Sequence, residues 1–304
     1  MKHTLKITLI LLSFFLIAQI FGSYTIIKYL VVEKTPEGII TIFHNDTAIG
    51  PQPEVQQKTL SFIPLTIAIL VGTVILLLLI RFRMRRFWKL WFLLAVWMSM
   101  AITIGVYINL KIALAVALLL ALFKVFKSNP ILHNLTEILV YTGIAIIILP
   151  FLDLISASSL LVLISIYDMY AVWKSKHMIK MAKFQTASKL FAGFMIGYKK
   201  EKKGKTVIAQ APKTYKGKTR IAILGGGDIA FPLIFSAVVI EYLILHDITK
   251  MQAFFQSLII SLASGAALLF LFIKGQKDKF YPAMPFISIG CFIGLGIIWL
   301  INLL

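Results

Sequence analysis

The sequence predicts an all-α, polytopic membrane protein with nine transmembrane helices. Hydrophobic residues form 60% of the 304-residue chain, charged residues form 14%, and the mean hydropathy is +0.92. Soluble domains are about 45–50% apolar and about 25% charged, so these values exclude a water-soluble enzyme and a disordered chain. The single cysteine, Cys291, excludes a disulfide scaffold and a multi-cysteine zinc site.

Nine apolar runs are candidates for crossing the bilayer, whose hydrocarbon core takes about 20 helical residues. The fourth run is shorter than the others, and the fifth and sixth meet at Asp153, so eight spans is the alternative count. The predicted spans are Leu5–Ile27, Leu60–Ile80, Trp88–Ile108, Ile112–Phe126, Leu135–Leu152, Leu154–Trp173, Ile221–Leu245, Ala253–Ile273 and Ala283–Leu304.

The first run also has features of a secretory signal peptide, because Lys2 and Lys6 precede an apolar segment. Two observations argue against cleavage. Ile20 and Phe21 crowd the candidate cleavage site, and the apolar stretch continues through Tyr24–Leu30. We therefore expect this run to be retained as the first transmembrane helix.

Loop charge predicts the orientation of the spans. The net charge of +19 is concentrated in alternate loops, and the loop Lys174–Arg220 holds nearly half of the basic residues against one acid, Glu201. Basic loops stay in the cytoplasm, so we expect the N-terminus inside and the C-terminus outside. This distribution fits nine spans better than eight. The excess charge is then suited to anionic lipid, and no basic stretch has the aromatic pattern of a nucleic-acid module.

Two acids inside the spans are candidates for chemistry. Asp168 lies about a turn and a half before the cytoplasmic end of the sixth span, and Asp228 about two turns into the seventh. Consecutive antiparallel helices tend to be neighbours, so the two carboxylates are expected to face each other. Two carboxylates in a low-dielectric site share one proton, which is the arrangement that aspartic proteases use. A single intramembrane Asp would equally fit a salt bridge or an ion site.

The other charges near the spans have a simpler interpretation. Lys28, Lys111, Asp153 and Glu241 lie near predicted helix ends, where their side chains can reach water. Glu137 lies near the inner end of the fifth span and is expected to be interfacial.

Glycine and proline mark two further segments. Gly225, Gly226 and Gly227 precede Asp228, and Pro232 follows it by four residues. Glycines allow close approach of another group, and an internal proline removes one helical hydrogen bond and favours a kink. Pro282-Ala283-Met284-Pro285 opens the ninth span, where two prolines resist regular helix; a plain helix start is the alternative.

These segments together resemble a known family. Tyr167-Asp168 followed by Ala171-Val172, the GxGD at 225–228, and the Pro-Ala-Met-Pro at 282–285 resemble the three signature motifs of the presenilin and signal peptide peptidase intramembrane aspartyl proteases. They occur in that family's order and in its sixth, seventh and ninth spans. Met284 is a departure, since the family usually has Leu there. Met is apolar and of similar volume, so we expect function to survive.

The resemblance implies the roles of these residues. Asp168 and Asp228 would be the catalytic pair, while Tyr167, the three glycines and residues 282–284 would support the site and the substrate. It implies transmembrane-helix substrates, no metal and no organic cofactor. The inferred orientation and the short chain are most similar to a prokaryotic presenilin homologue in a cell membrane. Nothing in the sequence indicates an accessory subunit, and a homo-oligomer is compatible with it.

One short segment is a candidate substrate-binding strand. Ile221, Ala222, Ile223 and Leu224 are apolar and partly β-branched, and we expect them to hold an unwound substrate by main-chain hydrogen bonds. Thr206–Gln210 is expected to pair with the other edge of this strand. The alternative is that 221–224 form the first turn of the seventh helix. Gly38–Phe43 is a second candidate strand.

Three other functions have some support in the sequence. The first is a transporter or a cation or proton pathway that uses the Asp pair, although no inverted repeat is visible. The second is a non-catalytic scaffold. The third is dinucleotide binding, because 220–230 also fit G-x-G-x-x-A, but an apolar run long enough to cross a membrane follows instead of alternating soluble units.

The sequence predicts three parts of the chain: spans one to six (1–173), a basic cytoplasmic loop (174–220), and spans seven to nine (221–304).

Overall fold

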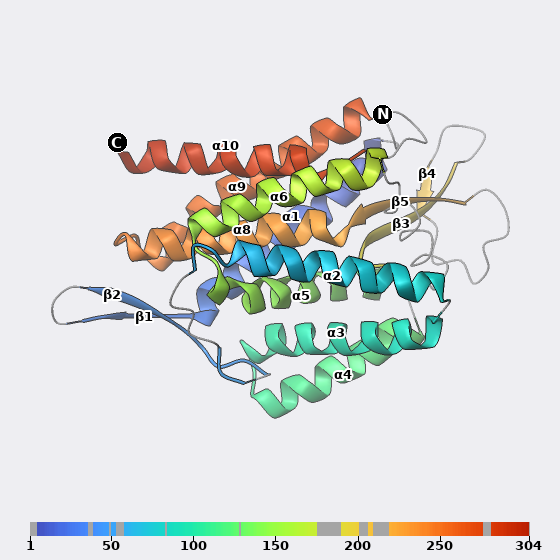
Figure 1. Ribbon diagram of the computed structural model, residues 1–304, viewed down its shortest axis with the longest axis horizontal. Helices are drawn as coiled ribbons and strands as arrows, with labels where there is room; N and C mark the ends of the chain where they lie inside the picture. The colour runs from blue at the N-terminus through green and yellow to red at the C-terminus, as the bar shows by residue number, and fades with distance from the viewer. Residues whose placement is uncertain are drawn as a thin grey trace.

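The structure is a computed structural model of a helix bundle with a small sheet at each end (Figure 1). It describes residues 5–35, 39–48, 50–52, 58–82, 84–127, 129–174, 190–200, 206–208, 219–275 and 281–303. The helices in these ranges are α1 (Leu5–Tyr29), α2 (Phe62–Arg81), α3 (Arg85–Gly105), α4 (Leu110–Phe126), α5 (Pro130–Ile148), α6 (Leu154–Met169), α8 (Gly226–Leu245), α9 (Lys250–Lys274) and α10 (Met284–Leu303). A 3₁₀ turn, η1 (Leu149–Phe151), extends α5, and a π-helical turn, η2 (Tyr170–Lys174), extends α6.

Eight of the helices in the described ranges are long and apolar enough to cross a bilayer. The other, α4, has 17 residues, which is about 26 Å of helix. The helices run side by side along the long axis of the bundle, and α1 begins at the end opposite to the one where α10 ends (Figure 1). Of the eight spans, α8 is the most buried and α2 the least. The most buried span packs against α1, α5, α6, α9 and α10, so it forms the centre of the bundle.

The described residues include five strands, so the prediction of an all-α protein is corrected to a mainly helical one. The hairpin β1 (Leu30–Lys34) and β2 (Ile40–His44) continues from α1 and projects from one end of the bundle (Figure 1). Its second strand covers most of the stretch predicted at 38–43. At the opposite end lies a three-stranded antiparallel sheet of order β4-β3-β5. Its strands are β3 (Gly193–Lys200), β4 (Thr206–Ile208) and β5 (Thr219–Gly225).

The start of the seventh span was predicted wrongly. Helix α8 begins at Gly226, five residues after the predicted start at Ile221, because 219–225 form β5. In that strand Ala222 and Leu224 are buried while Ile223 is only partly so, the alternation of a strand with one core-facing side. Gly225 then takes an extended conformation as the N-cap residue of α8.

The expected partner of Thr206–Gln210 was also wrong. Residues 206–208 pair with β3, in the register Tyr198↔Ile208, and not with β5. Strand β5 instead pairs along the other edge of β3, from Gly193↔Gly225 to Lys199↔Thr219. Of the basic loop predicted at 174–220, residues 175–189, 201–205 and 209–218 lie outside the described residues.

Candidate active site

The three sequence motifs meet at the end of the bundle that carries the three-stranded sheet. Helix α6 packs against α8, and α10 packs against both. Asp168 is the penultimate residue of α6, Asp228 lies in the first turn of α8, and Met284 is the first residue of α10. Asp228 is therefore not two turns inside its helix, as its predicted span implied. The five residues predicted to open that helix, 221–225, belong to β5 instead.

Asp168 is held by the backbone of the Pro-Ala-Met-Pro segment. Its side chain is 5% exposed, and its Oδ2 accepts a hydrogen bond of 3.1 Å from the N–H of Met284. A second hydrogen bond comes from the backbone of Ala283. The first N–H groups of a helix have no partner within it, so the N–H of Met284, and that of Ala283 just before α10, are free to bind this carboxylate. The contact uses main-chain atoms, so it does not depend on whether residue 284 is Met or Leu.

Asp228 folds back over the glycines that precede it. The residue is 9% exposed, and a Cβ built on Gly225 would lie 3.2 Å from its Oδ2. A Cβ on Gly226 would lie 2.7 Å from the hydroxyl oxygen of Tyr141, a residue of α5. The glycines thus make room for a carboxylate and a buried tyrosine ring. Pro232 has no N–H, so it cannot donate to the carbonyl oxygen of Asp228.

Tyr167 and two serines connect α6 to its neighbours. The Tyr167 hydroxyl donates to Thr73 Oγ1 on α2 over 3.4 Å. One face of α6 carries Ser165, whose hydroxyl lies 2.8 Å from that of Ser288, one turn into α10. Helices α6 and α10 are therefore linked twice, by the Asp168–Met284 hydrogen bond at the end of the bundle and by the serine contact deeper inside it. Sequence reasoning did not identify either serine.

The backbone of β5 has one edge directed away from the sheet. Gly193 binds α5 through both its N–H and its C=O, so the antiparallel pair Gly193↔Gly225 is one without mutual hydrogen bonds. Pairs with and without mutual hydrogen bonds alternate along an antiparallel ladder, so Met195↔Ile223, two residues further, is also a pair without them. The N–H and C=O of Ile223 therefore point to the outer edge of β5. Among the described residues no strand pairs with that edge.

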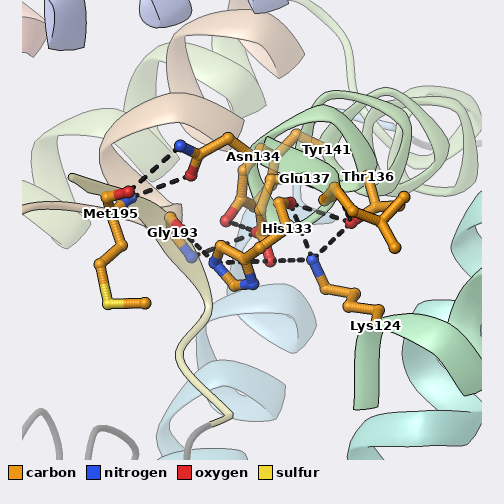
Figure 2. A network of polar contacts seen from close by, with 9 residues as sticks. Lys124, His133, Asn134, Thr136, Glu137, Tyr141, Gly193 and Met195 are labelled. Carbon is orange, nitrogen blue, oxygen red and sulfur yellow. Dashed lines mark hydrogen bonds and ion pairs between the residues drawn. The ribbon is translucent and has the colours of Figure 1, made fainter. Parts of the chain in front are cut away.

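A buried ion pair lies beside the sheet and was not predicted (Figure 2). Lys124 of α4 and Glu137 of α5 are 2% and 1% exposed, and Nζ lies 2.7 Å from Oε1. Glu137 was expected at the interface and is instead buried. Its signal was present, since opposite charges on consecutive antiparallel spans at similar depth are expected to meet.

Glu241 was expected to reach water, and that prediction was also wrong. It is 7% exposed and pairs with Lys58 at 2.8 Å and His44 at 3.2 Å. The hairpin and the segment before α2 fold over the end of α8 and cover it. In the described part of the chain, no three His, Cys, Asp or Glu side chains are grouped to hold a metal ion.

Comparisons with known proteins agree with this arrangement. The family model of signal-peptide peptidase and presenilin aspartyl proteases matches residues 41–303. The structure of a presenilin family intramembrane aspartate protease in space group C222 superposes with a TM-score of 0.56, at 17% identity over 95% of this chain and 94% of that one. Another such structure, in space group P2, gives a TM-score of 0.46, at 18% identity over 97% and 98%. No curated protein matches the sequence.

The family match covers most of the chain, and the structural likeness shows the presenilin-like fold. Together with the eight apolar helices they identify an integral, multi-pass membrane protein. They do not favour a transporter or a cation pathway. The chain belongs to the signal-peptide peptidase and presenilin family of aspartyl proteases.

Proposed function

We propose that this protein is an aspartic endopeptidase that cleaves transmembrane helices inside the bilayer, with Asp168 and Asp228 as its catalytic pair. The observation that carries the proposal is the meeting of three distant motifs at one end of three packed helices, with both carboxylates buried. A pair of buried acids on neighbouring helix ends has the residue types and the shelter from bulk water that peptide hydrolysis by this chemistry requires.

The reaction follows from one proton shared by two carboxylates. The ionised carboxylate removes a proton from a water molecule as the water oxygen bonds to the peptide carbonyl carbon. The protonated carboxyl donates to the carbonyl oxygen and stabilises the tetrahedral intermediate. When the C–N bond breaks, the carboxyl that took the water proton gives it to the leaving nitrogen, and the other carboxylate takes back its proton as the carbonyl re-forms. The N–H groups of Ala283 and Met284 fix the orientation of Asp168 in each step.

The outer edge of β5 is suited to bind the substrate before it is cut. A helical substrate hides its peptide bonds in its own hydrogen bonds, and unwinding it in the membrane exposes N–H and C=O groups at a cost of several kcal/mol each. Ile223, and Ile221 and Gly225 in the same alternation, direct backbone groups outward where an extended peptide can pair with them. This edge ends at Gly225, three residues before Asp228, so a paired substrate would lead directly to the acids.

The proposed membrane arrangement has nine spans, with the N-terminus in the cytoplasm and the C-terminus outside. It counts α4 as a span, and it is supported by the basic character of the loops at the sheet end and by the opposite positions of the α1 start and the α10 end (Figure 1). Both acids then lie near the cytoplasmic face. The proposed location is the cell membrane of a prokaryote, and the proposed substrates are membrane proteins with a single span.

The test is cleavage by the purified protein in lipid vesicles. A panel of synthetic single-span peptides that differ in helix stability, each with a fluorophore and a quencher, reports hydrolysis. We expect cleavage by the wild type, none by Asp168→Asn or Asp228→Asn, and a bell-shaped pH–rate profile, because one group must be charged and the other protonated. Substantial activity in either variant, or no cleavage of any peptide by the wild type, would refute the proposal. Unchanged thermal unfolding of the variants is the control.

A further inference from the structure

The Lys124–Glu137 pair has every polar group satisfied although it lies in the interior. Besides its contact with Glu137, the Lys124 ammonium donates to the carbonyl oxygen of His133 at 3.1 Å and to Thr136 Oγ1 at 2.8 Å (Figure 2). Three donors therefore have three acceptors. A buried ion pair contributes little net stability compared with apolar residues of the same shape. The pair thus calls for an explanation beyond stabilisation of the fold.

Side chains of α5, including that of Glu137, form the hydrogen bonds along one edge of β3 that the backbone of a neighbouring strand would otherwise form. Glu137 Oε2 accepts from the Gly193 N–H at 3.2 Å, and His133 Nε2 donates to the Gly193 carbonyl at 2.9 Å. Asn134 donates to the Met195 carbonyl at 3.1 Å and accepts from its N–H at 3.0 Å (Figure 2). Residues two apart in a strand present their backbone groups on the same edge, so α5 closes this edge of β3 as a paired strand would.

The opposite edge of β3 leads to the GxGD segment. Gly193 pairs with Gly225, and the next N–H, that of Gly226, donates to the Ala192 carbonyl at 3.2 Å. Gly193 has a φ of +141°, and a Cβ there would lie 2.2 Å from the Leu224 carbonyl oxygen. Only glycine fits at position 193, where β3 comes this close to the backbone of β5. The position of β3, fixed on one side by α5, therefore determines the position of the backbone two residues before Asp228.

A second route reaches the same backbone through Tyr141. Its hydroxyl donates a hydrogen bond to Glu137 Oε2, and the ring lies directly against Gly226. The ring also contacts Phe194 of β3 edge-on, with centroids 6.2 Å apart. Glu137 thus anchors both the strand that pairs with Gly225 and the tyrosine that packs on Gly226.

We propose that Glu137, paired with Lys124, is a positioning residue for catalysis that sets the direction of the Asp228 carboxylate through β3 and Tyr141. The inference rests on the proposed function, since it assigns a role within the same active site. Asp228 is the third residue of α8, and the three residues before it are glycines, which supply no side chain of their own to fix the turn. The network supplies that constraint from α4 and α5.

Two variants separate positioning from stability. Glu137→Leu alone removes the acceptor of the Gly193 N–H and of the Tyr141 hydroxyl and leaves a buried ammonium without its counter-charge, so we expect a large drop in Tm. Adding Lys124→Met removes that charge and keeps a side chain of similar length, so the Tm should rise again. For a positioning residue, the kcat of the double variant stays at least about tenfold below wild type while KM changes less than about twofold. Recovery of kcat together with Tm would overturn the inference.

A matched control removes the ion pair between Lys58 and Glu241 of α8. The double variant Lys58→Met, Glu241→Leu makes the same chemical change thirteen residues from Asp228, about 20 Å along the helix. It is expected to change Tm and leave kcat at the wild-type value. An equal loss of kcat here would show that any buried charge pair affects turnover and would also overturn the inference.

Tyr141→Phe tests the second route and decides the question if the double variant does not fold. It removes one oxygen atom and keeps the ring against Gly226, and we expect kcat to fall about fivefold at constant KM. Wild-type kcat in this variant and in the double variant, with cleavage still dependent on both aspartates, would refute the positioning role and leave the proposed function standing. A wild type that cleaves none of the peptides would refute both.

Discussion

At the scale of single residues, the site depends on main-chain donors and on the absence of side chains. Asp168 is bound by the N–H groups of residues 283 and 284, and Asp228 lies over Gly225. Both features depend on residues, proline and glycine, that leave neighbouring backbone atoms accessible. Prolines flank the two donors without competing for them, and glycines leave space that any other residue would fill. The motifs are thus short because backbone atoms perform much of their function.

The contact between Gly226 and Tyr141 leads to a prediction about a single methyl group. Gly226→Ala places a Cβ 2.7 Å from the Tyr141 hydroxyl oxygen and about as close to two ring carbons, at 3.0 and 3.1 Å. Tyr141 is buried and bound to Glu137, so the α8 start must move instead. A displacement of several tenths of an ångström at a catalytic group costs on the order of 10–100-fold in kcat. Peptide cleavage rates at saturating substrate measure it.

The control for that prediction is Gly296→Ala in α10, where nothing lies within 4 Å of the added Cβ. Replacing a helical glycine there should raise stability by about 0.5–1 kcal/mol and leave cleavage unchanged. If Gly226→Ala cleaves at the rate of this control, the contact with Tyr141 does not constrain the active site.

At the scale of elements, sequence patterns predicted the helices well and the sheet only in part. Long apolar runs specify helices locally, so most boundaries agree within a few residues. The strand at 221–224 was anticipated from its β-branched residues, but its partner was not. Strand β3 contains two glycines and two lysines, and its edge is completed by side chains of α5. No local pattern in residues 193–200 could predict that this strand binds side chains of a helix so distant in the sequence.

The geometry of β5 gives a prediction for one strand residue. Ile223→Pro removes an N–H that points to the outer edge, and it leaves the β3–β5 hydrogen bonds of the neighbouring pairs in place. If substrate pairs with that edge, cleavage should fall at least about tenfold, since a main-chain bond at membrane depth is lost. Ile223→Ala shortens the side chain but keeps the N–H, and it should retain most activity. Equal rates for the wild type and Ile223→Pro, with both proteins folded, would rule out pairing at this edge.

At the scale of the whole molecule, the chain places its chemistry at one end of the bundle. The ends of α6, α8 and α10 that carry the motifs lie beside the β3–β5 sheet, while the hairpin β1–β2 lies at the far end (Figure 1). The order of motifs along the sequence could predict this meeting, because it depends only on the alternation of spans. The buried network of α4 and α5 could not be read from motif order. It depends on how two further helices pack against the sheet.

The number of spans is decided by α4, and its two ends offer the test. With 17 residues it measures about 26 Å, slightly less than the roughly 30 Å of hydrocarbon, so a helix lying on one face is the competing arrangement. Lys111 lies in the first turn of α4, Lys127 directly follows its last residue, and both are exposed. In a nine-span protein with its N-terminus inside, Lys111→Cys should react with a membrane-impermeant thiol reagent added outside, and Lys127→Cys only after the inner face is opened. Cys291 is buried, and Cys291→Ala removes it as background. Labelling of both positions from one side would show that α4 does not cross the membrane, and the chain would then have eight spans with both termini on the same side.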